Sequence, residues 1–249
     1  MWKLILLGWL IYAIIFNLAL IRKPPRPQQK PPIRPKPPGP MRLLVIGATG
    51  GTGKQLVQQA LAQGHHVTAL VRTPAKVEIT HACLRVLRGD VLDEASLETA
   101  MLGQDAVLSA LGHIVFYKPT TILSEGTRNI MRAMKSCEVR RFVCESSLGV
   151  GDTVGRLGLL PTLLFVPLVL PFYVRDRLRK EELITRSKAE WIIVRPTVLT
   201  NGAATSKYQH GLEVGNYFLG NRVSRADVAD FMLKQLRDDT YVGTAVGIV

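Results

Sequence analysis

Cysteine is scarce in this chain of 249 residues, and its few positions follow no recognisable spacing. The three cysteines are Cys83, Cys137 and Cys144, an odd number without a CxxC pair. This excludes a disulfide framework and is typical of free thiols in a reducing compartment. The histidines offer no metal site either, because the adjacent pair His65 and His66 lacks the spacing of metal ligands. We therefore expect no metal.

Acidic residues are absent from the first 40 positions, which hold seven lysines and arginines. The whole chain has a formal net charge of +13, but the remaining 209 residues contain 25 basic and 19 acidic side chains, a net charge of +6. More than half of the positive excess therefore belongs to a short N-terminal part. The rest shows no stripe of interleaved basic and aromatic residues, so nucleic-acid binding is not expected.

Charge is also missing from residues 4–21, a run in which only Asn17 is strongly polar. As a helix rising ~1.5 Å per residue, this run would measure roughly 27 Å, close to the hydrocarbon thickness of a bilayer. We predict a single transmembrane anchor over residues 1–21, with a cleaved signal peptide and a buried core helix as alternatives. Six basic residues follow the run and only Lys3 precedes it, so the positive-inside rule places the body of the protein on the cytoplasmic side.

Proline, in contrast, is concentrated, since nine of the fifteen prolines lie in residues 22–40. Proline fixes φ and removes a backbone donor, which favours an extended, semi-rigid linker whose basic residues stay near anionic lipid head groups. A docking motif for an SH3-like partner in PPIRPKPP is the alternative. We expect the linker to separate the anchor from a domain over residues 41–249.

A glycine-rich turn follows the first apolar segment of that domain. Residues 42–46 predict a strand, Gly47 to Gly53 read GATGGTG, and residues 54–62 place their apolar side chains on one helical face. Glycine allows a tight turn and a close approach to a pyrophosphate, and the helix N-terminus supplies free N–H groups. A Walker A loop is excluded because Ala48 and Gln55 stand at two of its required positions. The pattern predicts a bound dinucleotide.

The next predicted strand, residues 65–71, ends at Arg72, with Lys76 shortly after it. A free ribose 2′-hydroxyl is usually bound by an acidic residue at this strand end, whereas a 2′-phosphate needs cations. The cofactor is therefore predicted to be NADP(H) rather than NAD(H), and a solvated loop arginine is the alternative.

Further strands are predicted at residues 84–88, 106–109, 141–144 and 191–194, with helical segments between them. This alternation is typical of an α/β fold with a doubly wound parallel sheet. Ligands bind such sheets at the carboxyl ends of the strands.

Eight segments then carry a family resemblance. In chain order they are GATGGTG, VRTPAKV, GDVLD, SALG, SEGTRNI, SSLGVGD, WIIVRPTVLTNG and SRADVADFML. This set resembles the NmrA-like atypical short-chain dehydrogenases/reductases, and within them the flavin and biliverdin-IXβ reductases. The resemblance covers residues 41–249 and implies a Rossmann-type NAD(P)-binding domain. By position it implies pyrophosphate contacts at Gly47, Thr49, Gly50, Gly51 and Thr52, a 2′-phosphate at Arg72 and Lys76, adenine at Asp90 and Val91, and the nicotinamide at Leu111, Gly112, Ser147 and Pro196.

The catalytic pair of the wider family is altered. Typical short-chain dehydrogenases use Tyr-x-x-x-Lys, in which the lysine lowers the pKa of the proton-donating tyrosine. Here Tyr173 is followed four residues later by Arg177, which keeps its proton but can stabilise a phenolate. Lys180 is expected on a different helical face, and Val198 stands where the related reductases have a histidine. Tyr173 remains a candidate proton donor beside Ser147, although the resemblance implies that these reductases manage without the pair.

Residues 157–174 form a second uncharged run, interrupted by Pro161, Pro167 and Pro171. Three prolines argue against a second spanning helix. Packing in the core, an apolar wall of an acceptor pocket and a surface that dips into the bilayer all remain open.

Together these features predict a membrane-anchored, NADPH-dependent reductase of a flavin, tetrapyrrole, quinone or other conjugated small molecule. A non-catalytic NADP-sensing regulatory or assembly protein is the alternative. Ser147 favours the enzyme and Arg177 favours the sensor, while a sugar-nucleotide epimerase would need the missing lysine.

Overall fold

The computed structural model describes residues 2–23, 39–112, 119–169 and 171–249. Its centre is an eight-stranded sheet in the order β3-β2-β1-β4-β5-β6-β10-β8, in which only β8 runs antiparallel to its neighbour. The strands are β1 (Arg42–Ile46), β2 (His66–Val71), β3 (Leu84–Arg88), β4 (Ala106–Ser109), β5 (Arg141–Glu145), β6 (Glu190–Pro196), β8 (His210–Gly211) and β10 (Thr244–Ile248). The predicted α/β Rossmann-type fold is confirmed.

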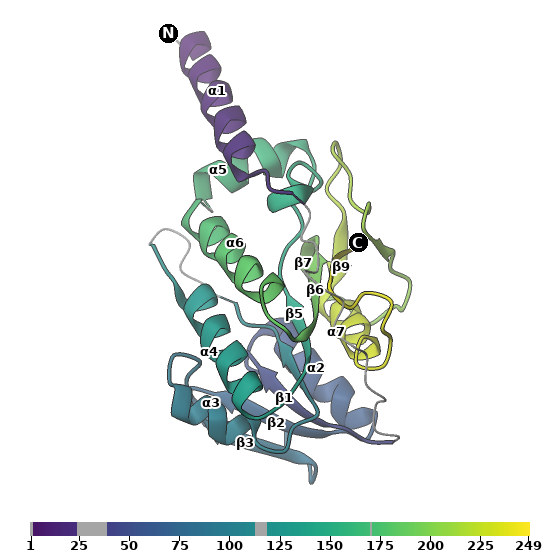
Figure 1. The fold of residues 1–249 in the computed structure, drawn as a ribbon. Coiled ribbons are helices and arrows are strands. Elements are labelled where there is room, and N and C mark those ends of the chain that lie inside the picture. Colours follow the sequence, from purple (N-terminus) through teal and green to yellow (C-terminus); the bar gives the residue numbers. More distant parts are fainter. Residues whose placement is uncertain (1, 24–38, 113–118, 170) are drawn as a thin grey trace.

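Helices cover both faces of this sheet (Figure 1). On one face α2 packs against α7, and on the other α3 packs against α4 and α4 against α6. These helices are α2 (Gly51–Ala62), α3 (Glu94–Met101), α4 (Ile122–Ser136), α6 (Pro171–Thr185) and α7 (Arg225–Lys234). The central strands β1 and β4 are mostly apolar, as expected for strands buried on both faces. In β1, for example, Leu43 and Val45 join the core beneath α2, while Leu44 and Ile46 join the core on the opposite face.

Several short elements were not predicted from the sequence. β7 (Val198–Thr200) and β9 (Arg222–Ser224) form a separate two-stranded parallel sheet, and β8 is an added edge strand of two residues. Strands this short have no detectable alternation of apolar and polar residues, and their pairing is between distant parts of the chain. The strand predicted over residues 65–71 begins one residue later, at His66.

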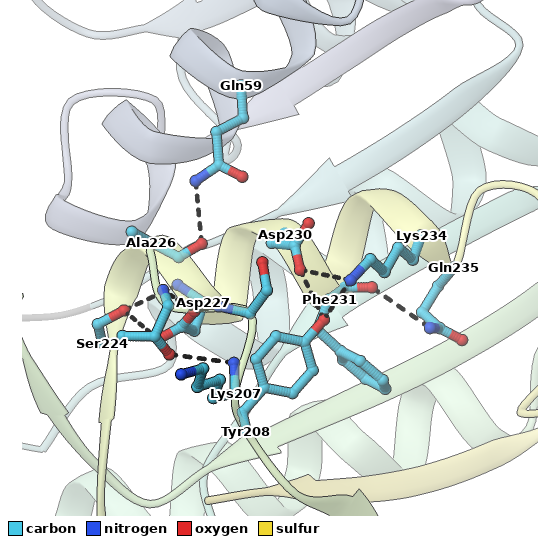
Figure 2. A network of polar contacts seen from close by, with 12 residues as sticks. Gln59, Lys207, Tyr208, Ser224, Ala226, Asp227, Asp230, Phe231, Lys234 and Gln235 are labelled. Atoms are coloured by element: carbon cyan, nitrogen blue, oxygen red, sulfur yellow. Dashed lines mark hydrogen bonds and ion pairs between the residues drawn. The ribbon is translucent and has the colours of Figure 1, made fainter. Parts of the chain in front are cut away.

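The N-terminus of α7 is fixed by a polar network (Figure 2). The Ser224 hydroxyl accepts a 2.9 Å hydrogen bond from the Asp227 N–H and thereby caps the helix. The Asp227 carboxylate accepts hydrogen bonds from Ser224 and from the backbone N–H groups of Thr205 and Ser206. Burial alone would raise the pKa of Asp227, but these donors hold it below its usual value. Gln59 of α2 donates to the carbonyl of Ala226 and joins the two helices.

Helix α1 (Trp2–Leu20) leaves the domain at one end (Figure 1). Its C-terminal half contacts the π-helical turn Pro161–Phe165 and α5 (Val166–Val169). The Asn17 side-chain amide donates to the carbonyls of Ala13 and Thr162, at 2.8 and 2.9 Å. The uncharged N-terminal run is therefore packed against the uncharged run of residues 157–174 at its inner end.

That second run is broken into short helical pieces, as its prolines predict. The turn starts at Pro161 and α6 starts at Pro171. A proline at the start of a helix costs no hydrogen bond, because the first N–H groups of a helix have no intrahelical acceptor. Val166 and Val174 are buried together with Leu20 of α1. Leu160, however, is 68% exposed. The run thus contributes both to a small core and to the surface.

Candidate functional site

The predicted site residues lie at the carboxyl ends of neighbouring strands. Gly47 follows β1, Leu111 follows β4 by two positions, Ser147 follows β5 by two positions, and Pro196 ends β6. β1 pairs with β2 on one side and β4 on the other, so the order of strands reverses between β1 and β4. A crevice at such a reversal is where open α/β sheets bind their ligands.

The glycines of the first turn are required by close backbone contacts. Gly47 has φ +81°, and a Cβ there would lie 2.4 Å from the carbonyl oxygen of Ala110. A Cβ on Gly53 would lie 2.0 Å from the carbonyl oxygen of Gly47. The turn is therefore packed directly on the loop after β4 and on the first turn of α2, which no larger residue would allow.

The N-terminus of α2 is open toward this edge. Its N-cap is Gly50, and no side chain in the described parts of the chain caps the helix. The first-turn N–H groups of a helix have no intrahelical partner and carry the positive end of the helix dipole. The loop and the helix together form a cradle for an anion, with Gly50 and Gly51 exposed and Thr49 half-buried.

The neighbouring strand ends lie on either side of this cradle. Ile46 of β1 pairs with Leu70 of β2, so the exposed Arg72 and Lys76 follow directly beyond the adjacent strand. Beyond β3, the Asp90 carboxylate accepts a 3.0 Å hydrogen bond from the Leu92 N–H, and Val91 is buried. Leu111 is half-buried and Gly112 exposed, and the following residues 113–118 lie outside the described parts.

A protein-family profile described as NAD(P)H-binding matches residues 47–239. The chain belongs to this family. An uncharacterised chloroplastic protein of Arabidopsis thaliana is 30% identical over 84% of this chain and 76% of its own length. Photosystem II assembly factor Ycf39 of Synechocystis is 33% identical over 45% of this chain and 35% of its own length. Among solved structures, the anaerobilin reductase ChuY of Escherichia coli superposes with a TM-score of 0.68 at 23% identity, over 84% of this chain and 96% of its own.

The NAD(P)H-binding domain thus confirms the family resemblance, and the cradle fits the cofactor's pyrophosphate. In this turn a Cβ would clash with backbone atoms at Gly47 and Gly53, and with the Arg225 side chain at Gly51. The Thr52 hydroxyl is used within the protein, because it donates a 3.1 Å hydrogen bond to Glu145. The Thr52 hydroxyl hydrogen is therefore not available to an anion in the cradle.

Ser147 and Tyr173 line one small cavity of about 30 Å³, together with Arg177. The Arg177 guanidinium donates to the Tyr173 hydroxyl, and its Cζ lies 4.6 Å from the centre of the Tyr173 ring. The i to i+4 spacing on α6 therefore brings the two side chains together, as in the Tyr-x-x-x-Lys pattern.

Lys180 takes no part in this pair. Its side chain is fully buried, and its Nζ donates a 2.7 Å hydrogen bond to the carbonyl of Glu145 at the end of β5. The expectation of a different helical face was wrong: α6 is one continuous helix, so Lys180, seven residues after Tyr173, lies two turns further along on nearly the same face. Lys180 fixes the end of β5 and with it the start of the segment that carries Ser147.

Two residues near the glycine turn were missed by the sequence reasoning. The Arg225 side chain crosses the N-terminus of α2, since a Cβ on Gly51 would lie 2.4 Å from its Cδ. It is held there by Asn201, whose side-chain oxygen accepts a 2.6 Å hydrogen bond from it. Glu145 lies nearby, where burial raises its pKa against the opposing effect of Arg177. No local sequence signal marks either residue, because Arg225 reaches Gly51 and Glu145 reaches Thr52 across more than 90 positions of the chain.

A buried ion pair holds α6 against the ends of β5 and β6. Arg195 donates to both carboxylate oxygens of Glu181, at 3.2 and 2.6 Å, and to Asp152 at 2.7 Å. The Ser146 hydroxyl also donates to Glu181. Burial would raise the pKa of Glu181, but Arg195 holds it below its usual value. This network fixes Tyr173 and Arg177 relative to Ser147 and Pro196.

Within residues 2–23, 39–112, 119–169 and 171–249, no three His, Cys, Asp or Glu side chains are grouped so as to hold a metal ion. All three cysteines are free thiols, and burial raises the pKa of Cys144, which keeps it protonated and unreactive.

Proposed function

We propose that this NAD(P)H-binding protein is a membrane-anchored, NADPH-dependent reductase of a conjugated small molecule. The observation that carries this proposal is that Ser147 and Tyr173 line one cavity at the carboxyl edge of the sheet that also carries the glycine cradle. A hydroxyl pair at this position can orient a carbonyl or ring nitrogen and supply a proton as hydride arrives. Pro196, at the end of β6, closes the same edge.

NADPH is the proposed form of the cofactor. The side chains that follow β2 are Arg72 and Lys76, both exposed and free to approach a 2′-phosphate. The adenine is assigned to Asp90 and Val91, the pyrophosphate to the turn Gly47–Gly53 with Thr49 and Thr52, and the nicotinamide to Leu111, Gly112 and Ser147. Arg225 adds a cation close to the pyrophosphate.

Membrane anchoring is assigned to α1. This helix has 19 residues and a mean hydropathy of 2.1, which is long and apolar enough to cross a bilayer. The chain is accordingly divided into an anchor at 1–21, a basic linker at 22–40 and the NAD(P)-binding domain at 41–249, placed on the cytoplasmic side. Most of that linker, residues 24–38, lies outside the described residues. Resistance of the full chain to carbonate extraction, together with proteolysis of the domain in inverted vesicles only, tests this arrangement.

The acceptor is proposed to be planar and apolar. Apart from its polar side chains, the cavity at Ser147 is lined by Leu148, Val150, Leu157, Val166 and Val174. At about 30 Å³ it is far smaller than the several hundred cubic ångströms of typical ligand pockets. An acceptor must therefore stack at the open edge or displace the apolar run of residues 157–174.

The small cavity also favours a second candidate, a protein that binds NADP(H) without turning it over. Arg177 covers the Tyr173 ring, and little space remains beside Ser147. The similarity to an assembly factor supports this candidate, although the chain spans only about a third of that relative.

One experiment separates the two candidates. The full chain is purified in detergent, loaded with NADPH and mixed rapidly with FMN, biliverdin or a short-chain quinone. The reductase predicts loss of NADPH absorbance with at least one acceptor at a rate that saturates with its concentration. Tight NADPH binding without oxidation by any acceptor would favour the sensor.

A further inference from the structure

A cavity of about 660 Å³ lies where α1 meets the domain. Its walls are the C-terminal end of α1, the turn at Gly151 and Asp152, and the face of α6 that carries Arg175, Arg179 and Glu182. It shares no lining residue with the cavity at Ser147 and Tyr173, which lies on another face of α6. This second cavity, the cation cavity below, is thus separate from the proposed reductase site.

The charge of the cation cavity is positive. Four basic side chains line it outside the buried network: Arg22, Lys23, Arg175 and Arg179. Of the acids that line it, Asp152 and Glu181 share Arg195, and Glu182 pairs with Arg186. With five basic and three acidic side chains, the lining keeps a net charge of +2. Across the parts of the chain that the structure describes, no ion pair involves Lys23, Arg175 or Arg179. Clustered unpaired cations in a concave site attract an anion.

The carbonyl groups at the C-terminal end of α1 accept hydrogen bonds from a neighbouring side chain rather than from the domain. Arg22 donates to the carbonyls of Ala19 and Ile21, at 2.9 and 3.0 Å. These bonds offset the negative end of the helix dipole, which would otherwise repel an anion. Lys23, Arg175 and Arg179 therefore remain to bind one.

Exposed apolar side chains surround the same end of the domain. Residues 157–159 run beside residues 216–218, joined by the bridge between Leu157 and Asn216 and by a hydrogen bond from the Leu159 N–H to the Phe218 carbonyl. In Figure 1, α5 lies on the side of the domain from which α1 leaves. The apolar patch formed by these segments consists of Leu159, Leu160, Leu164, Tyr217, Phe218 and Leu219, of which Phe218 is 79% exposed. A patch of this kind is expected to meet a protein or a membrane.

We propose that the cation cavity binds the phosphate of an anionic lipid head group, with the apolar patch in contact with the surrounding acyl chains. The proposal rests on the proposed anchoring by α1, which places the cavity at the level of the head groups. The cavity volume is that of a small-molecule site, and basic side chains at a helix end are typical of lipid head-group recognition. A free phosphate anion has the same chemistry but lacks the acyl chains that the patch would contact.

The test uses the full chain in detergent and measures bound lipid by native mass spectrometry during titration with phosphatidylglycerol or phosphatidylcholine. Phosphatidylglycerol should bind with about tenfold or greater preference, since each cation near an anionic phosphate contributes measurably. The double variant Arg175→Gln/Arg179→Gln should lose that preference. The matched control Lys135→Gln/Lys188→Gln removes two exposed cations outside the cavity and should bind lipid as the wild type does.

Equal retention of phosphatidylglycerol by both double variants would overturn the proposal. Displacement of the lipid by millimolar inorganic phosphate would overturn the lipid assignment in favour of a free-anion site. The affinity for NADPH is measured on the same samples and should be equal in all three proteins. Failure of lipid binding with intact NADPH oxidation would then contradict only this inference, whereas failure of oxidation with intact lipid binding would contradict only the proposed reductase.

Discussion

The guanidinium of Arg177 lies over the ring of Tyr173, with its Cζ 4.6 Å from the ring centre, and donates a hydrogen bond to the phenol oxygen. An arginine in the place of the usual lysine can stabilise a phenolate but cannot pass a proton onward. A proton given up by Tyr173 must therefore be replaced from solvent or through the Ser147 hydroxyl at the same cavity.

Replacing Tyr173 with phenylalanine tests this role. If Tyr173 donates the proton, Tyr173→Phe should lower the rate of acceptor reduction by about 100-fold or more, as expected for loss of a general acid. The affinity for NADPH should not change, because the ring stays in place. Tyr217→Phe removes an exposed hydroxyl elsewhere and serves as the control. Equal rates for the two variants would exclude Tyr173 as the donor.

Arg72 is expected to distinguish NADPH from NADH. Arg72→Glu removes a charge-assisted hydrogen bond to the 2′-phosphate and adds repulsion, so NADPH affinity should fall roughly 10- to 100-fold. NADH affinity should change much less. The measurement is cofactor titration by intrinsic fluorescence, with Arg85→Glu on β3 as a control of equal charge change. An equal loss of affinity for NADPH and NADH in Arg72→Glu would contradict the assignment of the 2′-phosphate to this residue.

The glycine turn should not tolerate a methyl group at Gly53. A Cβ there would lie 2.0 Å from the Gly47 carbonyl oxygen, so Gly53→Ala must shift the turn and the start of α2. We expect NADPH binding to be lost at any accessible cofactor concentration. Gly202→Ala meets only ordinary contacts, at 3.7 Å and beyond, and should bind NADPH normally. Calorimetric titration compares the two, and normal binding by Gly53→Ala would contradict the cradle.

The Asp227 network should make folding stability sensitive to acid. The folded-state pKa of Asp227 lies below its usual value of 3.8, so its stabilising effect is complete above that value and is lost as the pH falls through the folded pKa. Asp227→Asn should lower the free energy of unfolding at neutral pH by about 1–3 kcal/mol.

Urea unfolding at pH 7 and at pH 3 provides the measurement for Asp227. The difference between wild type and Asp227→Asn should shrink at the lower pH, because the carboxyl becomes protonated. Glu213→Gln, at an exposed carboxylate, should leave stability unchanged at both values. A difference that stays constant with pH would argue against the charged network as its cause.

The sequence predicted the elements whose cause is local. The strand from Arg42 to Ile46, the glycine turn and α2 follow from residues that are adjacent in the chain. The i to i+4 relation of Tyr173 and Arg177 needed only the assumption of a helix.

Contacts between distant segments could not be predicted in this way. The Thr52 hydroxyl is bound by Glu145, 93 positions away, and Arg225 lies over Gly51 because α7 packs beside α2. The pairing of β7 with β9 and the contact of Asn17 with Thr162 depend on tertiary packing in the same way. Each of these contacts forms only in the folded protein, and no residue next to either partner in the sequence indicates it.

The central claim, hydride transfer from NADPH at the edge that carries Ser147 and Tyr173, is tested most directly with NADPH deuterated at either face of the nicotinamide C4. The full chain is mixed in single turnover with FMN, biliverdin and a short-chain quinone, and the decay of bound NADPH is followed. The account predicts oxidation by at least one acceptor, slower with deuterium on one face only, because a single fixed edge presents the ring. NADPH that stays bound and unoxidised with all three, or a decay equally fast with both labels, would contradict it.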